Sequence, residues 1–297
     1  MSGADRTTAG LAGPNGPEVR HLAFGGAVEP AHLPRTLRWR RAWDGAMLRF
    51  DLAWPEGPPP PEGYPLMVVT DANAMFATLV ETARLQAAGP ERQSRREPVI
   101  LGIGHDTPAL FDVSARMRDY APPGSSRLME EIAGLLDHLG HLIPLDNARR
   151  ALAGHSLGGL FVLTTLFQRW DLFSHFIAAS PSIWCARTAV RDGAARLLAR
   201  TDRTHPSRLL ILAGGLERGE PRPQDEARLN PERRAVLVER RMVEEAEALV
   251  AWLAARRTTD TPERMSVRLE VIENETHTSV VPLALSRAVR FFAETDA

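Results

Sequence analysis

The sequence predicts an α/β fold in which a mostly parallel sheet is covered by helices on both faces. Three observations favour this fold. Runs of consecutive apolar residues recur along the chain, and such runs are typical of strands buried on both faces of a sheet. Segments with helical periodicity separate these runs, as expected for repeated βαβ units. Near the start, Asp44-Gly45 lies between two strand-like runs and predicts an antiparallel hairpin at one edge.

The predicted strands share two features. Each is a run of apolar or alternating residues, and each is bounded by glycine, proline or charged residues that favour turns. The first two form the hairpin, and the later ones are expected to pair in parallel. In chain order they are Leu37–Trp43, Ala46–Trp54, Leu66–Thr70, Pro98–Ile103, the run from Ala151 to Gly154, Phe173–Ala179, Arg208–Ala213 and Ser266–Ile272.

The predicted helices lie between these strands. The clearest one begins at Ser126 and runs to about His141, with leucine and isoleucine residues at helical spacing. Residues 107–125 and 214–233 are rich in polar residues, glycine and proline, and are expected to be irregular loops. The remaining helices are expected from Asp71 to about Ala88, from the turn after Gly154 to about Arg169, near Ala189–Ala199, over about Ala235–Arg257, and up to about Ala293.

Composition limits the possible partners and location of the protein. The 297 residues include 36 Lys and Arg against 37 Asp and Glu, so nothing indicates a nucleic-acid partner. The single cysteine, Cys185, excludes an intrachain disulfide. The N-terminus lacks the apolar core of a signal peptide, and no run approaches the roughly 18 apolar residues of a membrane span. We expect a cytoplasmic protein without a membrane partner, with a flexible arm over residues 1–18 and one domain over residues 19–297.

The segment Gly154-His155-Ser156-Leu157-Gly158 has the G-x-S-x-G pattern of a nucleophile elbow. An apolar run precedes it and a helix-compatible run follows it, which is the setting that this motif requires. The turn is so tight that a Cβ two positions before or after the serine would collide with neighbouring chain. It exposes the serine hydroxyl and places the N–H of Leu157 at a helix start, where the dipole favours an oxyanion. The alternative is an ordinary glycine-rich turn between a strand and a helix.

A base and an acid follow the serine in the chain order of an α/β-hydrolase fold. Glu217 comes just after the predicted strand Arg208–Ala213, and His277 comes just after the last predicted strand. A serine hydroxyl needs a base to accept its proton, and a carboxylate would fix the tautomer of that base. The sequence therefore predicts Ser156, His277 and Glu217 as a catalytic triad. Four other acids could replace Glu217 in this role, namely Glu220, Asp225, Glu273 and Glu275.

Other residues of the predicted site lie at the ends of earlier strands. The second oxyanion donor is expected to be a backbone N–H near Ala72 or Asn73, after the strand Leu66–Thr70. His105 ends a buried strand and is expected to reach the same cleft and contact substrate. The side chain of His155 is expected to point away from the nucleophile.

No cofactor or metal site is predicted. His138 and His141 have metal-like spacing but no evident third ligand, so a solvated helix face is the better interpretation. The pair Gly102 and Gly104 lacks the third glycine and the helix start that a dinucleotide site needs. We therefore expect a small-molecule substrate to be the partner of this site.

Taken together, these motifs resemble the putative esterase family of α/β-hydrolases, in particular its enterobactin and ferric-siderophore esterases. The resemblance extends from about Leu37 to Phe292 and is much more specific than the elbow alone. The segments that carry it are Thr70–Phe76, Gly104-His105, Arg116–Pro122, Gly154–Gly158, Ala178–Trp184, Gly215–Glu217, and His277 with Val281-Pro282.

The resemblance implies Ser156 as nucleophile and His277 as base, with Glu217 as the acid in members that have a full triad. It implies that Arg116 holds substrate near the oxyanion, with Trp184 among the substrate contacts; alternatively, Arg116 is simply paired with Asp119 or Asp112. Three residues depart from the family pattern. Ala72 lies in the turn after the strand Leu66–Thr70, and His105 and Cys185 are expected to alter the acyl pocket.

The sequence thus predicts a serine carboxylic-ester hydrolase that works through an acyl-enzyme, with siderophore-type esters as the expected substrates. The alternatives are a broad short-chain acyl esterase or thioesterase, an acyltransferase that excludes water, and a catalytically silent ligand-binding member of the fold.

Overall fold

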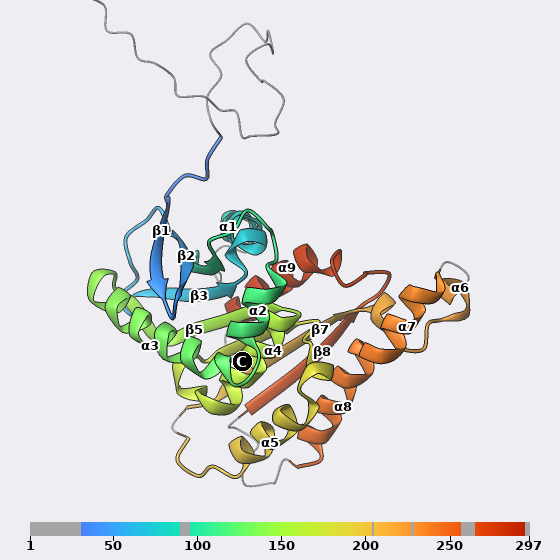
Figure 1. The fold of residues 1–297 in the computed structure, drawn as a ribbon. Coiled ribbons are helices and arrows are strands. Elements are labelled where there is room, and N and C mark those ends of the chain that lie inside the picture. The colour runs from blue at the N-terminus through green and yellow to red at the C-terminus, as the bar shows by residue number, and fades with distance from the viewer. Residues whose placement is uncertain (1–30, 90–95, 204, 227–228, 257–264, 295–297) are drawn as a thin grey trace, which may run out of the picture. The chain divides into compact units, whose positions relative to one another are not determined.

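A computed structural model describes residues 31–89, 96–203, 205–226, 229–256 and 265–294 (Figure 1). The chain divides into two units, Met1–Pro34 and Arg35–Ala297, and all elements described below belong to the second unit. The predicted arm over residues 1–18 and the predicted start of the domain at residue 19 lie outside the described residues. That boundary therefore stays a prediction.

One eight-stranded sheet, of order β1-β2-β4-β3-β5-β6-β7-β8, forms the centre of this unit. The pairs β1–β2 and β2–β4 are antiparallel, whereas all pairs from β4–β3 to β7–β8 are parallel. The predicted α/β-hydrolase type of fold, with an N-terminal antiparallel hairpin, is confirmed. The strands are β1 (Thr36–Trp43), β2 (Ala46–Ala53), β3 (Tyr64–Thr70), β4 (Val99–His105), β5 (Leu145–His155), β6 (His175–Ala179), β7 (Ser207–Gly214) and β8 (Met265–Ile272).

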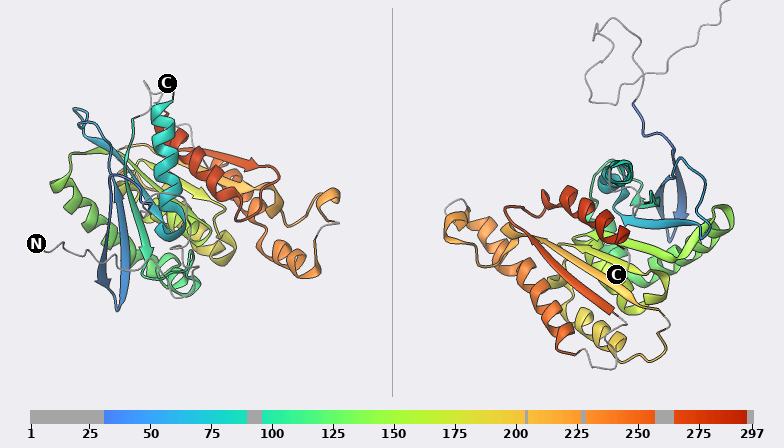
Figure 2. Two further views of the ribbon diagram at one scale, coloured as in Figure 1. Left: turned by 90° about the horizontal axis from the view of Figure 1, so that it is seen from above. Right: turned by 180° about the vertical axis from the view of Figure 1, so that it is seen from behind.

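Helices cover both faces of the sheet. Helices α1 and α9 pack side by side on one face, and the helices around α4 cover the other (Figures 1 and 2). Within the described residues, no helix combines the length and the apolar character needed to span a bilayer. The helices are α1 (Ala72–Ala88), α2 (Val113–Tyr120), α3 (Gly124–Leu142), α4 (Leu157–Gln168), α5 (Arg187–Leu198), α6 (Pro223–Glu226), α7 (Pro231–Arg240), α8 (Met242–Ala254) and α9 (Val280–Ala293), with short 3-10 turns η3 (Trp170–Leu172), η4 (Ile183–Cys185) and η5 (Gly215–Glu217).

The hairpin turn follows from its two residues. Asp44 and Gly45 have φ angles of 48° and 76°, as a two-residue turn between twisted antiparallel strands requires. Glycine adopts this conformation without a Cβ penalty, and aspartate tolerates it better than most residues.

The expectation of an irregular loop over residues 107–125 is wrong, because this segment contains helix α2. The carboxylate of Asp112 caps the helix by accepting a hydrogen bond of 2.9 Å from the N–H of Ala115. The buried side of α2 carries Arg116, Asp119 and Tyr120, whereas Val113 is exposed. Because polar residues face inward, the segment lacks the apolar periodicity by which a helix is recognised in sequence.

The expectation of one long helix over Ala235–Arg257 is also wrong. Helix α7 begins earlier, at Pro231, and its cap residue Asn230 accepts a hydrogen bond of 2.7 Å from the N–H of Arg233. The chain then turns at Arg241, whose φ is 47°, and α8 begins at Met242. No glycine or proline marks this break in the sequence, so local propensity could not predict it.

Candidate active site

Ser156 lies in the turn between β5 and α4, at the carboxyl edge of the sheet. Its φ and ψ are 60° and −115°, a conformation that non-glycine residues rarely adopt. A Cβ on Gly154 would collide with the main chain of Gly158, and one on Gly158 would collide with the hydroxyl of Thr70. The predicted steric reason for both glycines of the motif is confirmed.

Three residues from three loops form a continuous chain of hydrogen bonds. His277 Nε2 lies 3.0 Å from Ser156 Oγ, and His277 Nδ1 lies 2.6 Å from Glu217 Oε2. The carboxylate of Glu217 is buried, and its other oxygen accepts hydrogen bonds from Gly214 N at 2.8 Å and Ser180 Oγ at 2.5 Å. Both oxygens of the Glu217 carboxylate thus have partners, while the side chain of His277 keeps 22% exposure.

The other acids considered for this position lie elsewhere. Asp225 and Glu273 both pair with Arg222, at 2.6 and 2.9 Å, and Glu275 accepts a hydrogen bond from Ser279. Glu220 is exposed. Of the acids considered, the structure places Glu217 against the imidazole of His277.

Two helices begin at the edge of the sheet that carries Ser156. Leu157 is the first residue of α4, and Ala72 is the first residue of α1. Because β3 and β5 are parallel neighbours in the sheet, both helices begin at the same edge, and a Cβ on Gly158 of α4 would lie 3.1 Å from Oδ2 of Asp71, the residue before α1. The N–H groups of a first helical turn lack partners within the helix, and the helix dipole there favours a negative charge. This arrangement can stabilise an oxyanion between the two helix starts.

The side chain of Asn73 is committed to the end of β4. Its Nδ2 donates to the carbonyl oxygens of His105 and Thr107 at 3.1 and 2.8 Å, and its Oδ1 accepts from His105 N at 3.3 Å. Only its backbone N–H can therefore serve an oxyanion. Ala72 fits the turn because a glycine faces it: a Cβ on Gly102 would lie 2.8 Å from the Cβ of Ala72.

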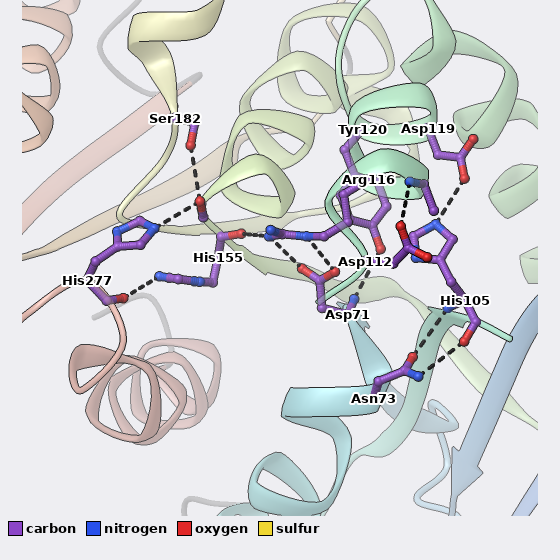
Figure 3. Close-up of polar contacts among 12 residues, drawn as sticks. Asp71, Asn73, His105, Asp112, Arg116, Asp119, Tyr120, His155, Ser182 and His277 are labelled. Atoms are coloured by element: carbon purple, nitrogen blue, oxygen red, sulfur yellow. Dashed lines mark hydrogen bonds and ion pairs between the residues drawn. The ribbon is translucent and has the colours of Figure 1, made fainter. Parts of the chain in front are cut away.

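Arg116 is buried and forms its ion pair with Asp71. The alternative that it pairs with Asp119 or Asp112 is wrong. Its Nε and Nη2 donate to the two carboxylate oxygens of Asp71 at 2.9 and 3.1 Å. Nη2 also donates to the main-chain oxygen of His155 at 2.9 Å (Figure 3). Burial raises the pKa of Asp71, and the charge of Arg116 opposes that rise.

His105 and Asp119 form a second buried pair of a histidine and an acid. His105 Nε2 lies 2.9 Å from Asp119 Oδ2, and Arg118 donates to both oxygens of the same carboxylate at 2.7 and 2.6 Å. Burial alone would raise the pKa of Asp119, but the hydrogen bonds from His105 and Arg118 hold it below its usual value. His105 is thus buried and held by Asp119.

Trp184 lies in η4, which follows β6 at the same edge of the sheet. Its ring is half-buried, and the guanidinium carbon of Arg240 lies 5.1 Å from the ring centroid. Among the predicted substrate contacts, Trp184 is the least buried.

Three residues at the site had no role in the sequence-based prediction. Ser182 Oγ lies 3.1 Å from Ser156 Oγ, and Ser180 hydrogen-bonds Glu217. Both serines follow β6, and polar residues just after a buried strand are the sequence signal that could have placed them at the site. The side chain of His155 is directed at His277: His155 Nε2 lies 2.7 Å from the main-chain oxygen of His277 (Figure 3).

Across the described ranges, no group of three or more histidine, cysteine or acidic side chains could hold a metal ion. Ser156, His277 and Glu217 provide a hydroxyl, a base and a buried acid, and the starts of α1 and α4 provide backbone N–H groups. This set of groups is suited to nucleophilic attack on a carbonyl carbon and to stabilising the resulting oxyanion.

Comparison with known proteins gives a consistent result. Residues 46–267 match the family model described as "Putative esterase". The chain is 33% identical over 266 residues to the ferri-bacillibactin esterase BesA of Bacillus subtilis, covering 82% of this chain and 83% of that one. It is 30% identical over 247 residues to the siderophore triacetylfusarinine C esterase of Aspergillus fumigatus, covering 77% and 82% of the two chains.

A similar solved structure is that of the BES protein from Bacillus cereus. The two structures superpose with a TM-score of 0.76 and 25% sequence identity, over 91% of this chain and all of the other.

Proposed function

Since this chain belongs to the putative esterase family and is a carboxylic ester hydrolase, we propose that it cleaves siderophore-type esters with Ser156 as nucleophile, His277 as base and Glu217 as orienting acid. The observation that carries this proposal is the hydrogen-bond chain from Glu217 through His277 to Ser156, with distances of 2.6 and 3.0 Å. A serine hydroxyl is a weak nucleophile without such a base.

In the first step Ser156 Oγ attacks the ester carbonyl carbon, and His277 Nε2 takes the hydroxyl proton. The carbonyl oxygen becomes an oxyanion, which accepts hydrogen bonds from the N–H of Leu157 and from the N–H of Ala72 or Asn73. The ester C–O bond then breaks, and His277 returns the proton to the departing alkoxide. The products of this step are an alcohol and an acyl group on Ser156.

In the second step His277 takes a proton from water, which attacks the acyl carbon. Collapse of the second oxyanion breaks the bond to Ser156 Oγ, and the proton returns to Ser156. Glu217 stays ionised throughout and stabilises the imidazolium that forms twice per turnover. The N–H of Gly214 and the hydroxyl of Ser180 hold this carboxylate in place.

We assign the substrate-facing residues by exposure. Trp184 is half-buried in η4 and is proposed to contact the acyl or aryl part of the substrate. Arg116 and His105 are buried and bonded to acids, so they are proposed to support the oxyanion loops from beneath. The names of the relatives support a siderophore ester as substrate.

The proposal is tested by comparing the wild type with Ser156→Ala on p-nitrophenyl acetate, p-nitrophenyl butyrate and enterobactin. Cleavage of enterobactin that is lost in the alanine variant would support the siderophore esterase. Cleavage of the simple esters alone would make the protein a short-chain acyl esterase. Equal rates for wild type and variant on every ester would contradict the role of Ser156.

A further inference from the structure

His155 and Ser156 are consecutive residues of the elbow, and both contact His277. The hydroxyl of Ser156 lies 3.0 Å from Nε2 of the His277 imidazole. Nε2 of His155 lies 2.7 Å from the main-chain oxygen of His277. Ser156 therefore contacts the imidazole of His277, and its neighbour His155 contacts the backbone of His277.

The protonation state of His155 follows from its partner and its burial. A carbonyl oxygen only accepts hydrogen bonds, so His155 Nε2 carries a hydrogen and donates it. Burial, and after it the positive charges of His277 and Arg116, lower the pKa of His155 to about 3. The ring of His155 is thus neutral at neutral pH. Although its centroid lies 4.5 Å from that of His277, it places no charge beside a base that must become positive.

The backbone of His155 is fixed in turn by Arg116. Nη2 of Arg116 donates to the main-chain oxygen of His155 at 2.9 Å, and the same guanidinium is bound by Asp71. Asp71 immediately precedes α1 and has a φ of 53°. A continuous series of contacts therefore joins the start of α1, helix α2, the elbow and the loop after β8.

We propose that His155 is a positioning residue, whose Nε2–H holds the backbone of His277 and thereby keeps the imidazole of His277 directed at Ser156. The role depends on the proposed function, because His155 acts only through the base. The loop after β8 is also held before His277, where Leu216 N donates to the oxygen of Glu275 at 3.0 Å and Arg222 Nη2 donates to Asn274 Oδ1 at 3.1 Å. At His277 itself, the contact with His155 holds the backbone, and the contact with Glu217 holds the imidazole.

Three variants separate the hydrogen bond from simple packing. His155→Leu removes the donor but keeps an apolar side chain. In His155→Gln the donor nitrogen Nε2 is four bonds from Cα, as Nε2 is in histidine. In His155→Asn the donor nitrogen Nδ2 is only three bonds from Cα and should not reach the oxygen of His277. Misplacing a catalytic group by about 1 Å costs up to about 100-fold in rate. We expect kcat per active site to fall about 10- to 100-fold in the leucine variant with KM nearly unchanged, and to recover to within about fivefold in the glutamine variant.

His175 offers a matched control. It is also buried, its pKa is likewise lowered to about 3, mainly by burial, and its ring packs against Phe291 and Phe292. It begins β6, however, and so lies at the edge of the sheet opposite to the catalytic loops. His175→Leu should lower the free energy of unfolding while leaving kcat per active site unchanged.

The measurement is kcat and KM on p-nitrophenyl butyrate, with active sites counted by a fluorophosphonate. Wild-type kcat in the leucine variant would overturn the positioning role, as would equal losses in the leucine and glutamine variants. If the leucine variant does not fold, the asparagine variant replaces it in the comparison with glutamine. Equal turnover by wild type and Ser156→Ala would instead contradict the proposed function, so the two failures are distinguishable.

Discussion

Two pairs of a buried acid and a histidine lie at the same edge of the sheet. In one, Glu217 and His277 lie 2.6 Å apart on the loops after β7 and β8. In the other, Asp119 of α2 and His105 at the end of β4 lie 2.9 Å apart. Measured by the acid–histidine contact alone, the two pairs are nearly equivalent, yet we assign catalysis to only one.

The surroundings of the two pairs explain the difference. His277 presents Nε2 to the hydroxyl of Ser156 and keeps 22% side-chain exposure, whereas the side chain of His105 is 8% exposed. Asp119 is shared with Arg118, a permanent cation, while Glu217 is held by the neutral donors Gly214 and Ser180. A carboxylate that already faces a fixed cation has less charge available to stabilise an imidazolium. We therefore propose catalysis for the pair whose histidine faces a hydroxyl and is partly exposed, and whose carboxylate faces no fixed cation.

The largest expected effect comes from replacing His277, and the same change at His105 is the comparison. His277→Gln should lower kcat/KM by at least about 1,000-fold, because the base and nucleophile act as a unit. His105→Gln should cost less than about tenfold, since its proposed role is support. Steady-state kinetics on p-nitrophenyl butyrate decides between these outcomes. A loss in the His105 variant as large as that in the His277 variant would contradict the distinction between the pairs.

Substitution of the two acids should give different kinds of defect. Glu217→Gln should lower kcat by about 100- to 10,000-fold with little loss of folding, because an amide cannot stabilise the imidazolium. Asp119→Asn should lower the free energy of unfolding by about 1–3 kcal/mol, because a charged hydrogen-bond network is weakened, and leave kcat within about tenfold. Urea unfolding measured beside kinetics separates the two. Wild-type kcat in the glutamine variant would remove Glu217 from the mechanism.

A smaller effect concerns a histidine that faces no acid. The pKa of His155 is about 3 in the folded protein and about 6.5 when unfolded, so the unfolded chain binds more protons between these values. Its contribution to the free energy of unfolding is present above about pH 6.5 and is lost as the pH falls toward 3. In His155→Gln the free energy of unfolding should fall less steeply as the pH is lowered, because up to about one proton fewer is taken up on unfolding. Unfolding measured between pH 7 and 4 tests this, and an unchanged slope would contradict a buried neutral His155.

Much of the fold could be predicted because its signals are local. Buried parallel strands are apolar runs, and the hairpin has its Asp-Gly turn, so the strands and their pairing type are confirmed. Helix α2 could not be predicted, because Arg116, Asp119 and Tyr120 face inward and remove its apolar periodicity. The break at Arg241 depends on how α7 and α8 pack, and no residue type marks it.

The candidate site was predictable only in part for a similar reason. Ser156, Glu217 and His277 each follow a strand, and the ends of parallel strands meet, so their approach could be inferred from chain order. The pairing of Arg116 with Asp71 depends on the orientation of α2, which no local sequence pattern specifies. The contact of His155 joins a side chain to a backbone oxygen, and backbone partners leave no signature in sequence.

The most direct test of the central claim is to identify the residue that becomes covalently modified. After reaction with a fluorophosphonate, peptide mass spectrometry should find one adduct, on Ser156, and Ser156→Ala should carry none. The neighbouring hydroxyl of Ser182, 3.1 Å away, is the internal control. An adduct on Ser182, or no adduct on an enzyme that hydrolyses esters, would contradict the account.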